Sequence, residues 1–157
     1  MNQTLRILIA DNDIDFARRL KASLDRQQDM QVVDIVRDGQ GAVNSCKETQ
    51  PDLVLMDLHL PVLDSIKAIQ HIATKNERIR ILTTSATPND RYAIEAIKAG
   101  ASGYIEKNNG IDDDKMANTI RQVAEGDVTL NPALAMSILE EFHRLTENET
   151  QKQTVND

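Results

Sequence analysis

Acidic side chains stand directly after two apolar segments of the chain. Residues 52–56, DLVLM, are followed by Asp57, and residues 6–10, RILIA, are followed by Asp11 and Asn12. A carboxylate beside a buried segment is costly without a partner, so its presence there indicates a chemical task. Grouped carboxylate and amide oxygens suit Mg²⁺, and a carboxylate beside the metal can attack phosphorus to form an acyl phosphate. The pattern predicts phosphoryl chemistry centred on Asp57.

Two further apolar segments end in groups that complete this chemistry. Residues 79–84, IRILTT, lead into Ser85, and residues 102–106, SGYIE, lead into Lys107. Phosphoryl transfer depends on alignment and charge neutralisation, which the ammonium group of Lys107 would supply together with a metal ion. The hydroxyl of Ser85 or of Thr84 would donate to the new phosphate.

Five short apolar segments alternate with amphipathic stretches. The four segments above and residues 30–36 are predicted strands, and their nearly continuous apolar character is typical of a parallel sheet covered on both faces. The stretches between them place apolar residues at helical spacing, for example Phe16, Ala17, Leu20 and Leu24. The alternation predicts an α/β doubly wound domain. Functional groups of such domains gather beyond the carboxyl ends of the strands, where these four strand ends would meet.

Three parts are expected along the 157 residues. Residues 1–126 form the doubly wound domain, and residues 127–146 form a linker helix whose start is marked by Asn131 and Pro132. The remaining residues, 147–157, are polar and are expected to be disordered.

Composition restricts the partners and the compartment. The formal net charge of −7 argues against binding to nucleic acid or to an anionic membrane, which need a basic surface. The apolar runs are too short to span a bilayer, and no signal segment is expected. The single cysteine, Cys46, excludes an internal disulfide and favours a cytoplasmic location. Its helical spacing from Val43 predicts a core residue rather than a reactive thiol.

Taken together, these segments resemble the receiver domain of two-component response regulators. The resemblance rests on LIADN, DLVLMDLHLP, ILTTSA and AGASGYIEK in this order and spacing, and it covers residues 5 to about 125. It implies a flavodoxin-like sheet of order 2-1-3-4-5 with five helices, followed by the linker helix. The later stretches VAEGDVTLNPALA and LTENE are similar to the linker and the output-domain start of the NarL/LuxR-type branch. The chain is expected to be a fragment that lacks the helix-turn-helix output domain, with a stand-alone receiver as the alternative.

The resemblance also implies the phosphoacceptor and its metal site. Asp57 would accept a phosphoryl group from a sensor histidine kinase, with Mg²⁺ bound. Asp11 and Asn12 stand where the family has its acidic metal-binding pair, and the backbone carbonyl of His59 would complete the set of protein ligands. Such a chain is not an enzyme beyond weak self-phosphorylation and autodephosphorylation.

A switch follows from the same resemblance. Ser85 stands at the switch hydroxyl, Tyr104 at the switch aromatic residue and Lys107 at the lysine that contacts the phosphate. Phosphorylation would change the face formed by the fourth strand, the fourth helix and the fifth strand. That face is expected to bind a second receiver or an output domain in bacterial transcription control, without direct binding of nucleic acid or membrane by this chain.

Two departures and two alternatives accompany this interpretation. Asn12 replaces the usual second acid, which predicts weaker Mg²⁺ binding or, as an alternative, a pseudo-receiver that binds partners without phosphorylation. Ser65 after Asp64 replaces the usual glycine, so an altered turn is expected. A haloacid-dehalogenase-like phosphatase would instead use Asp11 as nucleophile, but it would leave Asp57 unexplained. Asp13 and Asp64 are predicted to be helix caps rather than ligands.

Overall fold

The computed structural model describes residues 3–61, 64–87, 89–107 and 113–155, with side chains described to residue 148. Five parallel strands form one sheet in the order β2-β1-β3-β4-β5, which confirms the predicted fold class. The strands are β1 (Leu5–Ala10), β2 (Met30–Val36), β3 (Leu53–Asp57), β4 (Arg80–Ser85) and β5 (Gly103–Glu106). The helices are α1 (Ile14–Asp25), α2 (Gly39–Thr49), α3 (Ser65–Lys75), α4 (Asp90–Ala99), α5 (Asp113–Ala124) and α6 (Pro132–Val155).

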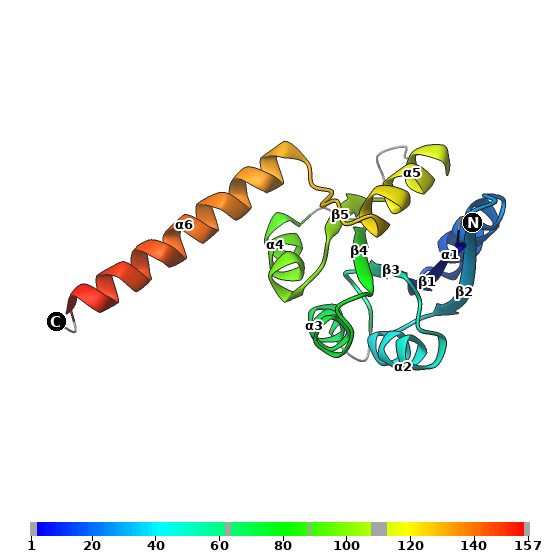
Figure 1. Ribbon diagram of the computed structural model, residues 1–157, viewed down its shortest axis with the longest axis horizontal. Helices are drawn as coiled ribbons and strands as arrows, with labels where there is room; N and C mark the ends of the chain where they lie inside the picture. Colours follow the sequence, from blue (N-terminus) through cyan, green and yellow to red (C-terminus); the bar gives the residue numbers. More distant parts are fainter. Residues whose placement is uncertain (1–2, 62–63, 88, 108–112, 156–157) are drawn as a thin grey trace.

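Helices cover both faces of the sheet (Figure 1). Residues of α1 and α5 belong to one hydrophobic core, and residues of α2, α3 and α4 belong to the other. In β1, Ile7 and Ile9 enter the first core, whereas Leu8 and Ala10 enter the second. Because successive side chains of a strand point to opposite faces, a sheet covered on both sides favours strands that are apolar nearly throughout, as β1 and β3 are.

Side-chain caps begin the helices that follow the strands. The carboxylate of Asp13 accepts a hydrogen bond from the backbone N–H of Phe16, and that of Asp64 accepts one from Ile66. Both residues are therefore N-caps, as predicted. In the part of the chain that the structure describes, no helix is both long and apolar enough to cross a bilayer.

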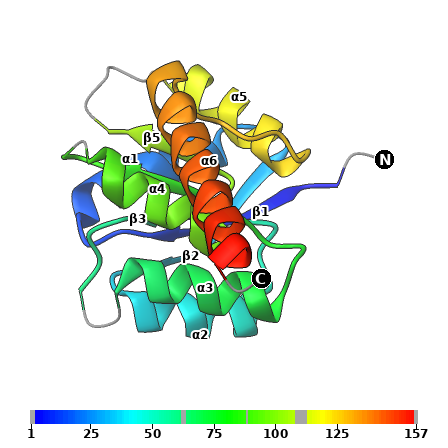
Figure 2. The same cartoon turned by 90° about the vertical axis from the view of Figure 1, so that its left-hand side faces the viewer.

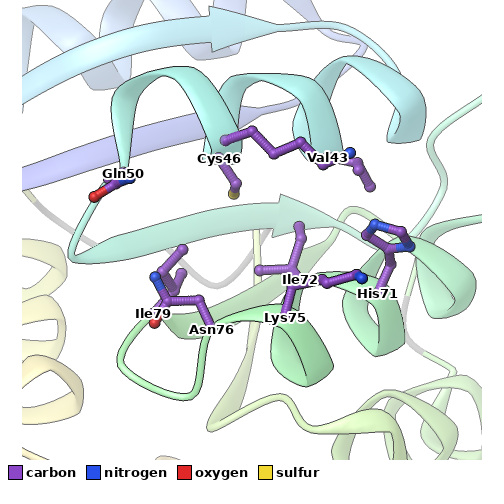
Figure 3. A pocket seen from close by; sticks show the side chains of 9 residues that line it. Val43, Cys46, Gln50, His71, Ile72, Lys75, Asn76 and Ile79 are labelled. Atoms are coloured by element: carbon purple, nitrogen blue, oxygen red, sulfur yellow. The ribbon is translucent and has the colours of Figure 1, made fainter.

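Cys46 lies on the buried side of α2, facing α3 (Figure 3). It is 6% exposed, and burial raises the pKa of its thiol to about 12. The thiol is therefore neutral at physiological pH and packs as a small apolar group, which confirms the prediction.

The segment after α5 runs back along the edge of the sheet. The backbone N–H of Tyr104 donates to the carbonyl of Thr129 at 3.0 Å, and the N–H of Thr129 donates to the carbonyl of Ser102 at 3.1 Å. Gly103 allows this close approach, because a Cβ there would lie 2.8 Å from the carbonyl oxygen of Thr129. Residues 128–131, which we call the strap, thus continue the hydrogen bonding of β5.

Helix α6 begins against α4 and then extends away from the sheet, as Figure 2 and Figure 1 show. Leu134 is fully buried in the core that contains Tyr104, and Lys98 of α4 bonds Glu141 at 2.7 Å. The helix continues to Val155, past the predicted end at residue 146 and into the tail that was expected to be disordered. Residues 146–155 contain no glycine or proline and several glutamates and glutamines, so nothing in them stops a helix.

An ion pair joins α5 to the loop before β2. Nε and Nη2 of Arg121 lie 2.7 and 2.8 Å from the two carboxylate oxygens of Asp29. The guanidinium lowers the pKa of the Asp29 carboxyl. Such a carboxyl stabilises the fold above its unfolded pKa of about 3.9, and this contribution is lost as the pH falls through the lower folded value.

We expect Arg121→Gln to lower the free energy of unfolding at pH 7 by at most about 1 kcal/mol, because solvent screens a pair whose side chains are 33% and 37% exposed. The free energies of unfolding of the two proteins, measured by denaturant titration, should become equal at a pH below the folded pKa of Asp29. A difference that persists in acid would mean that Arg121 acts through packing instead.

Candidate functional site

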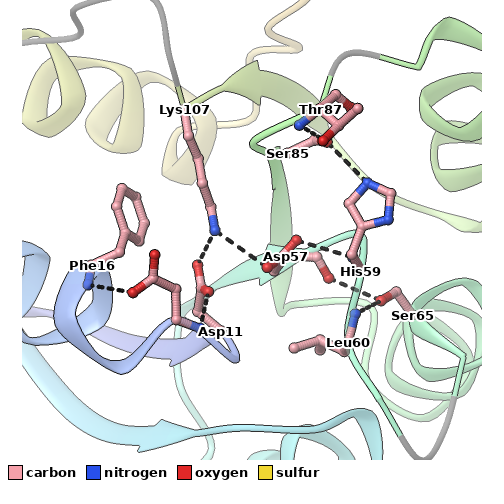
Figure 4. Close-up of polar contacts among 10 residues, drawn as sticks. Asp11, Phe16, Asp57, His59, Leu60, Ser65, Ser85, Thr87 and Lys107 are labelled. Carbon is pink, nitrogen blue, oxygen red and sulfur yellow. Dashed lines mark hydrogen bonds and ion pairs between the residues drawn. The ribbon is translucent and has the colours of Figure 1, made fainter.

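Two buried carboxylates meet one lysine at the carboxyl edge of the sheet (Figure 4). Asp11 follows β1, Asp57 ends β3 and Lys107 follows β5. Nζ of Lys107 lies 2.7 Å from Oδ2 of Asp11 and 3.2 Å from Oδ2 of Asp57. The three side chains are at most 10% exposed. The strand order reverses between β1 and β3, so the group stands at the switch point of the sheet.

The charges of this group do not cancel. Two carboxylates face one ammonium, which leaves one negative charge in a mostly buried place. Burial raises the pKa of Asp11, and the hydrogen bond from Lys107 opposes that rise. The ammonium also lies 4.5 Å from the centre of the Phe16 ring, within range of a cation–π contact. The site is therefore suited to a further cation.

Three hydrogen bonds hold the loop between β3 and α3. The N–H of His59 donates to Oδ1 of Asp57 at 3.0 Å. The hydroxyl of Ser65 donates to the backbone carbonyl of Asp57 at 2.9 Å and accepts from the N–H of Leu60 at 3.1 Å. Asp57 is thus fixed through both its side chain and its backbone, with Oδ1 on the loop side and Oδ2 facing Lys107.

The hydroxyl of Ser85 is already engaged. It donates to the carbonyl of Thr87 at 2.6 Å and lies 3.2 Å from Nε2 of His59. The His59 ring stacks on Tyr92, with ring centres 5.7 Å apart and planes inclined by 4°. Any new acceptor beside Asp57 must therefore compete with the carbonyl of Thr87 for the proton of this hydroxyl.

Tyr104 lies inside the fold on β5, the strand next to β4. Its side chain is 4% exposed, and burial raises the pKa of its hydroxyl. No hydrogen-bond partner of that hydroxyl is found among the described residues. Its backbone N–H holds the strap through Thr129, so Tyr104 joins the site edge of β5 to the segment that leads into α6.

The structure brings two of the predicted metal ligands together. Asp11 and Asp57 converge, whereas Asn12 is exposed to solvent. In the described part of the chain, no group of three or more His, Cys, Asp or Glu side chains is arranged to hold a metal. Mg²⁺ commonly takes one or two carboxylates and completes its shell with waters and phosphate oxygens. The acid pair, whose charge Lys107 neutralises only in part, fits this ion.

Three contacts of the site were not predicted from the sequence. They are the support of the Asp57 loop by Ser65, the ring of His59 beside Ser85, and the ring of Phe16 beside Lys107. The sequence predicts only an altered turn at Ser65 and only a carbonyl ligand at His59. The polar residue at the first position of α3 was a usable signal, because such a residue readily bonds to the preceding loop.

Comparisons with known proteins give the same assignment. A family model described as the response regulator receiver domain matches residues 7–121. The chain is 34% identical over 145 residues to the transcriptional regulatory protein DesR of Bacillus subtilis (strain 168), covering 92% of this chain and 71% of DesR. It is 26% identical over 148 residues to the transcriptional regulatory protein DegU of Brevibacillus brevis, covering 94% of this chain and 62% of DegU.

A solved structure matches as well. The crystal structure of a LuxR-family two-component response regulator from Aurantimonas sp. SI85-9A1 superposes with a TM-score of 0.77 at 31% identity, covering 88% of this chain and 98% of that one. The hypothesis of a haloacid-dehalogenase-like phosphatase finds no support in these matches. The family model matches the chain from β1 into α5, and two buried acids lie beside Lys107. This protein therefore belongs to the receiver domains of two-component response regulators.

Proposed function

We propose that Asp57 accepts a phosphoryl group from a sensor histidine kinase and that the phosphorylated domain changes its contacts with an output element. The observation that carries the proposal is the position of Lys107 between two buried carboxylates at the switch point of the sheet. A phosphoryl group on Asp57 would give this ammonium a doubly charged partner in place of a single carboxylate. The receiver acts here as a phosphoacceptor signalling domain rather than as a catalytic enzyme.

Mg²⁺ is the proposed cofactor. Asp11 and Asp57 would hold it, and the backbone carbonyl of His59 and the amide of Asn12 are the further candidates. When bound, the ion would neutralise charge that develops on the transferring phosphoryl oxygens. Lys107 would then be free to leave the acid pair and contact the phosphoryl group.

The transfer requires little covalent chemistry from the protein. A carboxylate oxygen of Asp57 attacks phosphorus, an O–P bond forms, and the N–P bond to the imidazole of the kinase histidine breaks. The imidazole leaves with its electron pair and takes up a proton. The N–H of His59 holds the attacking carboxylate, and the hydroxyl of Ser65 holds the backbone carbonyl of the same residue, so alignment supplies much of the effect.

The acyl phosphate, which carries a charge of roughly −2 at neutral pH, would draw in the hydroxyl of Ser85. That hydroxyl would leave the carbonyl of Thr87 and His59, and the end of β4 would move with it. Tyr104 lies on the neighbouring strand and holds the strap, so α6 is the proposed responding element. The phosphate can shift this equilibrium only by its differential free energy for the two states.

The proposed partners are a histidine kinase, an output domain and a second copy of the receiver. A histidine kinase supplies the phosphoryl group, and the relatives named above are transcriptional regulators, so transcription control through an output domain is proposed, in the cytoplasm. A homodimer through β4, α4 and β5 is also proposed. In the structure α6 lies against α4 through Glu141 and Lys98, so such a dimer must share this face with α6 or displace it.

Treatment with Mg²⁺ and a small phosphodonor such as acetyl phosphate, followed by mapping of the adduct, tests the proposal. An adduct on Asp57 supports the receiver function. An adduct on Asp11 would support phosphatase-like chemistry, and an unmodified protein would support the pseudo-receiver alternative.

Asn12→Asp should tighten Mg²⁺ binding. The substitution adds one negative charge beside Asp11, and hard divalent ions bind carboxylates more strongly than amides. We expect a gain of roughly tenfold in affinity, corresponding to about 1.4 kcal/mol, in a calorimetric titration. Asp13→Asn, which removes a charge at the adjacent cap, serves as a comparison. Unchanged affinity in Asn12→Asp would show that position 12 lies outside the metal shell.

A further inference from the structure

A small pocket opens between α2 and α3, at the edge of the sheet opposite to Asp57 (Figure 3). Its volume is about 240 Å³. The lining residues come from residues 43–47 of α2, from residues 71–75 of α3, from Gln50 after α2, and from Asn76 and Ile79 in the loop before β4. None of them belongs to the phosphoacceptor site, so the pocket is a separate feature of the fold.

The floor of the pocket is apolar. It is formed by Val43, Cys46, Ile72 and Ile79, each at most 7% exposed. Figure 3 shows the sulfur of Cys46 pointing from α2 into the space between the two helices. Because the thiol is neutral at physiological pH, this floor favours a hydrocarbon or aromatic group and offers no nucleophile to it.

The rim of the pocket is basic. Lys47, His71 and Lys75 contribute to the lining, and no aspartate or glutamate does. Acidic residues outnumber basic ones in this chain by 25 to 18, so an acid-free rim departs from the average surface. Among the described residues, neither lysine has an ion-pair partner. Their charges are therefore available to a ligand.

The negative ends of the two helix dipoles offset only part of the positive charge of Lys47 and Lys75. Lys47 and Lys75 stand in the last turns of α2 and α3, where each helix end carries about −0.5 charge. Two ammonium groups exceed two such half-charges by about one positive charge. The N–H groups of Gln50 and Asn76 also cap the carbonyls of Cys46 and Ile72 at 3.1 and 3.0 Å. Among the lining residues and the two helix ends, about one positive charge is therefore left at the mouth of the pocket.

We propose that this pocket binds a small organic carboxylate, with its apolar tail on the floor and its carboxylate between Lys47 and Lys75. The volume lies below the roughly 300–1,000 Å³ of sites for drug-sized ligands, so a short acyl or single-ring acid is the class that fits. The pocket selects by charge at the rim and by apolar contact at the floor.

The test uses octanoate as probe and the amide resonances of α2 and α3 as reporter. Octanoate shifts these resonances saturably, with a dissociation constant on the order of 1 mM for a ligand of this size. Octanol, which has the same tail without the charge, binds more weakly. Octylamine, which carries the opposite charge, produces no saturable shift.

Charge variants identify the rim contacts. Lys47→Gln and Lys75→Gln each weaken octanoate binding roughly two- to fivefold, the range for exposed ion pairs, and the double variant weakens it further. Lys67→Gln removes the same charge from α3 outside the pocket and leaves binding unchanged. Since all three lysines are exposed, folding is preserved. Equal binding of octanol and octanoate, absence of saturable shifts in α2 and α3, or equal effects of all three substitutions would overturn the proposal.

Discussion

Asp57→Asn is expected to lose the phosphoryl adduct, with incorporation from acetyl phosphate and Mg²⁺ reduced roughly 100-fold or more, because an amide is not a nucleophile for phosphorus. The substitution preserves size, and the amide oxygen can still accept the hydrogen bond from His59. Loss of the adduct would therefore reflect chemistry rather than misfolding. Intact-protein mass spectrometry measures the phosphorylated fraction directly.

Asp13→Asn is the matched control for this experiment. It makes the same chemical change two residues from Asp11, at a position whose side chain caps α1. Asparagine caps helices about as well as aspartate, so the adduct and the fold should both persist. If the adduct survived in Asp57→Asn and vanished in Asp11→Asn, the phosphoacceptor would be Asp11 and the proposed function would be wrong.

Leu134→Ala is expected to detach α6 from the receiver. Leu134 is fully buried, and removal of a buried leucine side chain costs about 2–5 kcal/mol. Because α6 has few other anchors in the described part of the chain, the loss should appear as local opening of α6 rather than as unfolding of the sheet. Amide exchange in α6 should accelerate at least roughly 30-fold, whereas exchange in β1 and β3 should not change.

Leu139→Ala gives the comparison on the same helix. Leu139 is 51% exposed, so its truncation should change exchange by a factor close to one, within about 0.5 kcal/mol. Equal acceleration in both variants would mean that α6 responds to helix propensity and not to its contact with the receiver.

Phosphorylation should change the contact between α6 and the rest of the receiver. If Tyr104 and the strap connect the site to α6, acetyl phosphate with Mg²⁺ will change the exchange of α6 in the wild-type chain and leave it unchanged in Asp57→Asn. An α6 that exchanges at the same rate in both proteins would show that the output element lies elsewhere on the domain.

The sequence by itself determined the sheet and the convergence of its polar ends. Apolar segments alternate with amphipathic ones, and parallel strands bring their carboxyl ends to one edge. Asp11, Asp57 and Lys107 could therefore be placed together before any coordinates were known, and the structure joins them through one ammonium. The N-caps Asp13 and Asp64 were equally predictable, because capping depends on residues three positions apart or fewer.

Tertiary structure alone decided how the groups around this cluster are arranged. His59 meets Ser85 across 26 positions of sequence, and Thr129 lies beside Gly103 through a loop and a helix. Such contacts depend on side-chain rotamers and on the path of each loop. The spacing of apolar residues in the sequence predicts neither of these. Leu134 and Phe142 of α6 stand eight positions apart and so share one helical face, yet Leu134 is buried whereas Phe142 is 66% exposed. A helical stripe shows that a face is apolar, but only the packed neighbours decide what covers it.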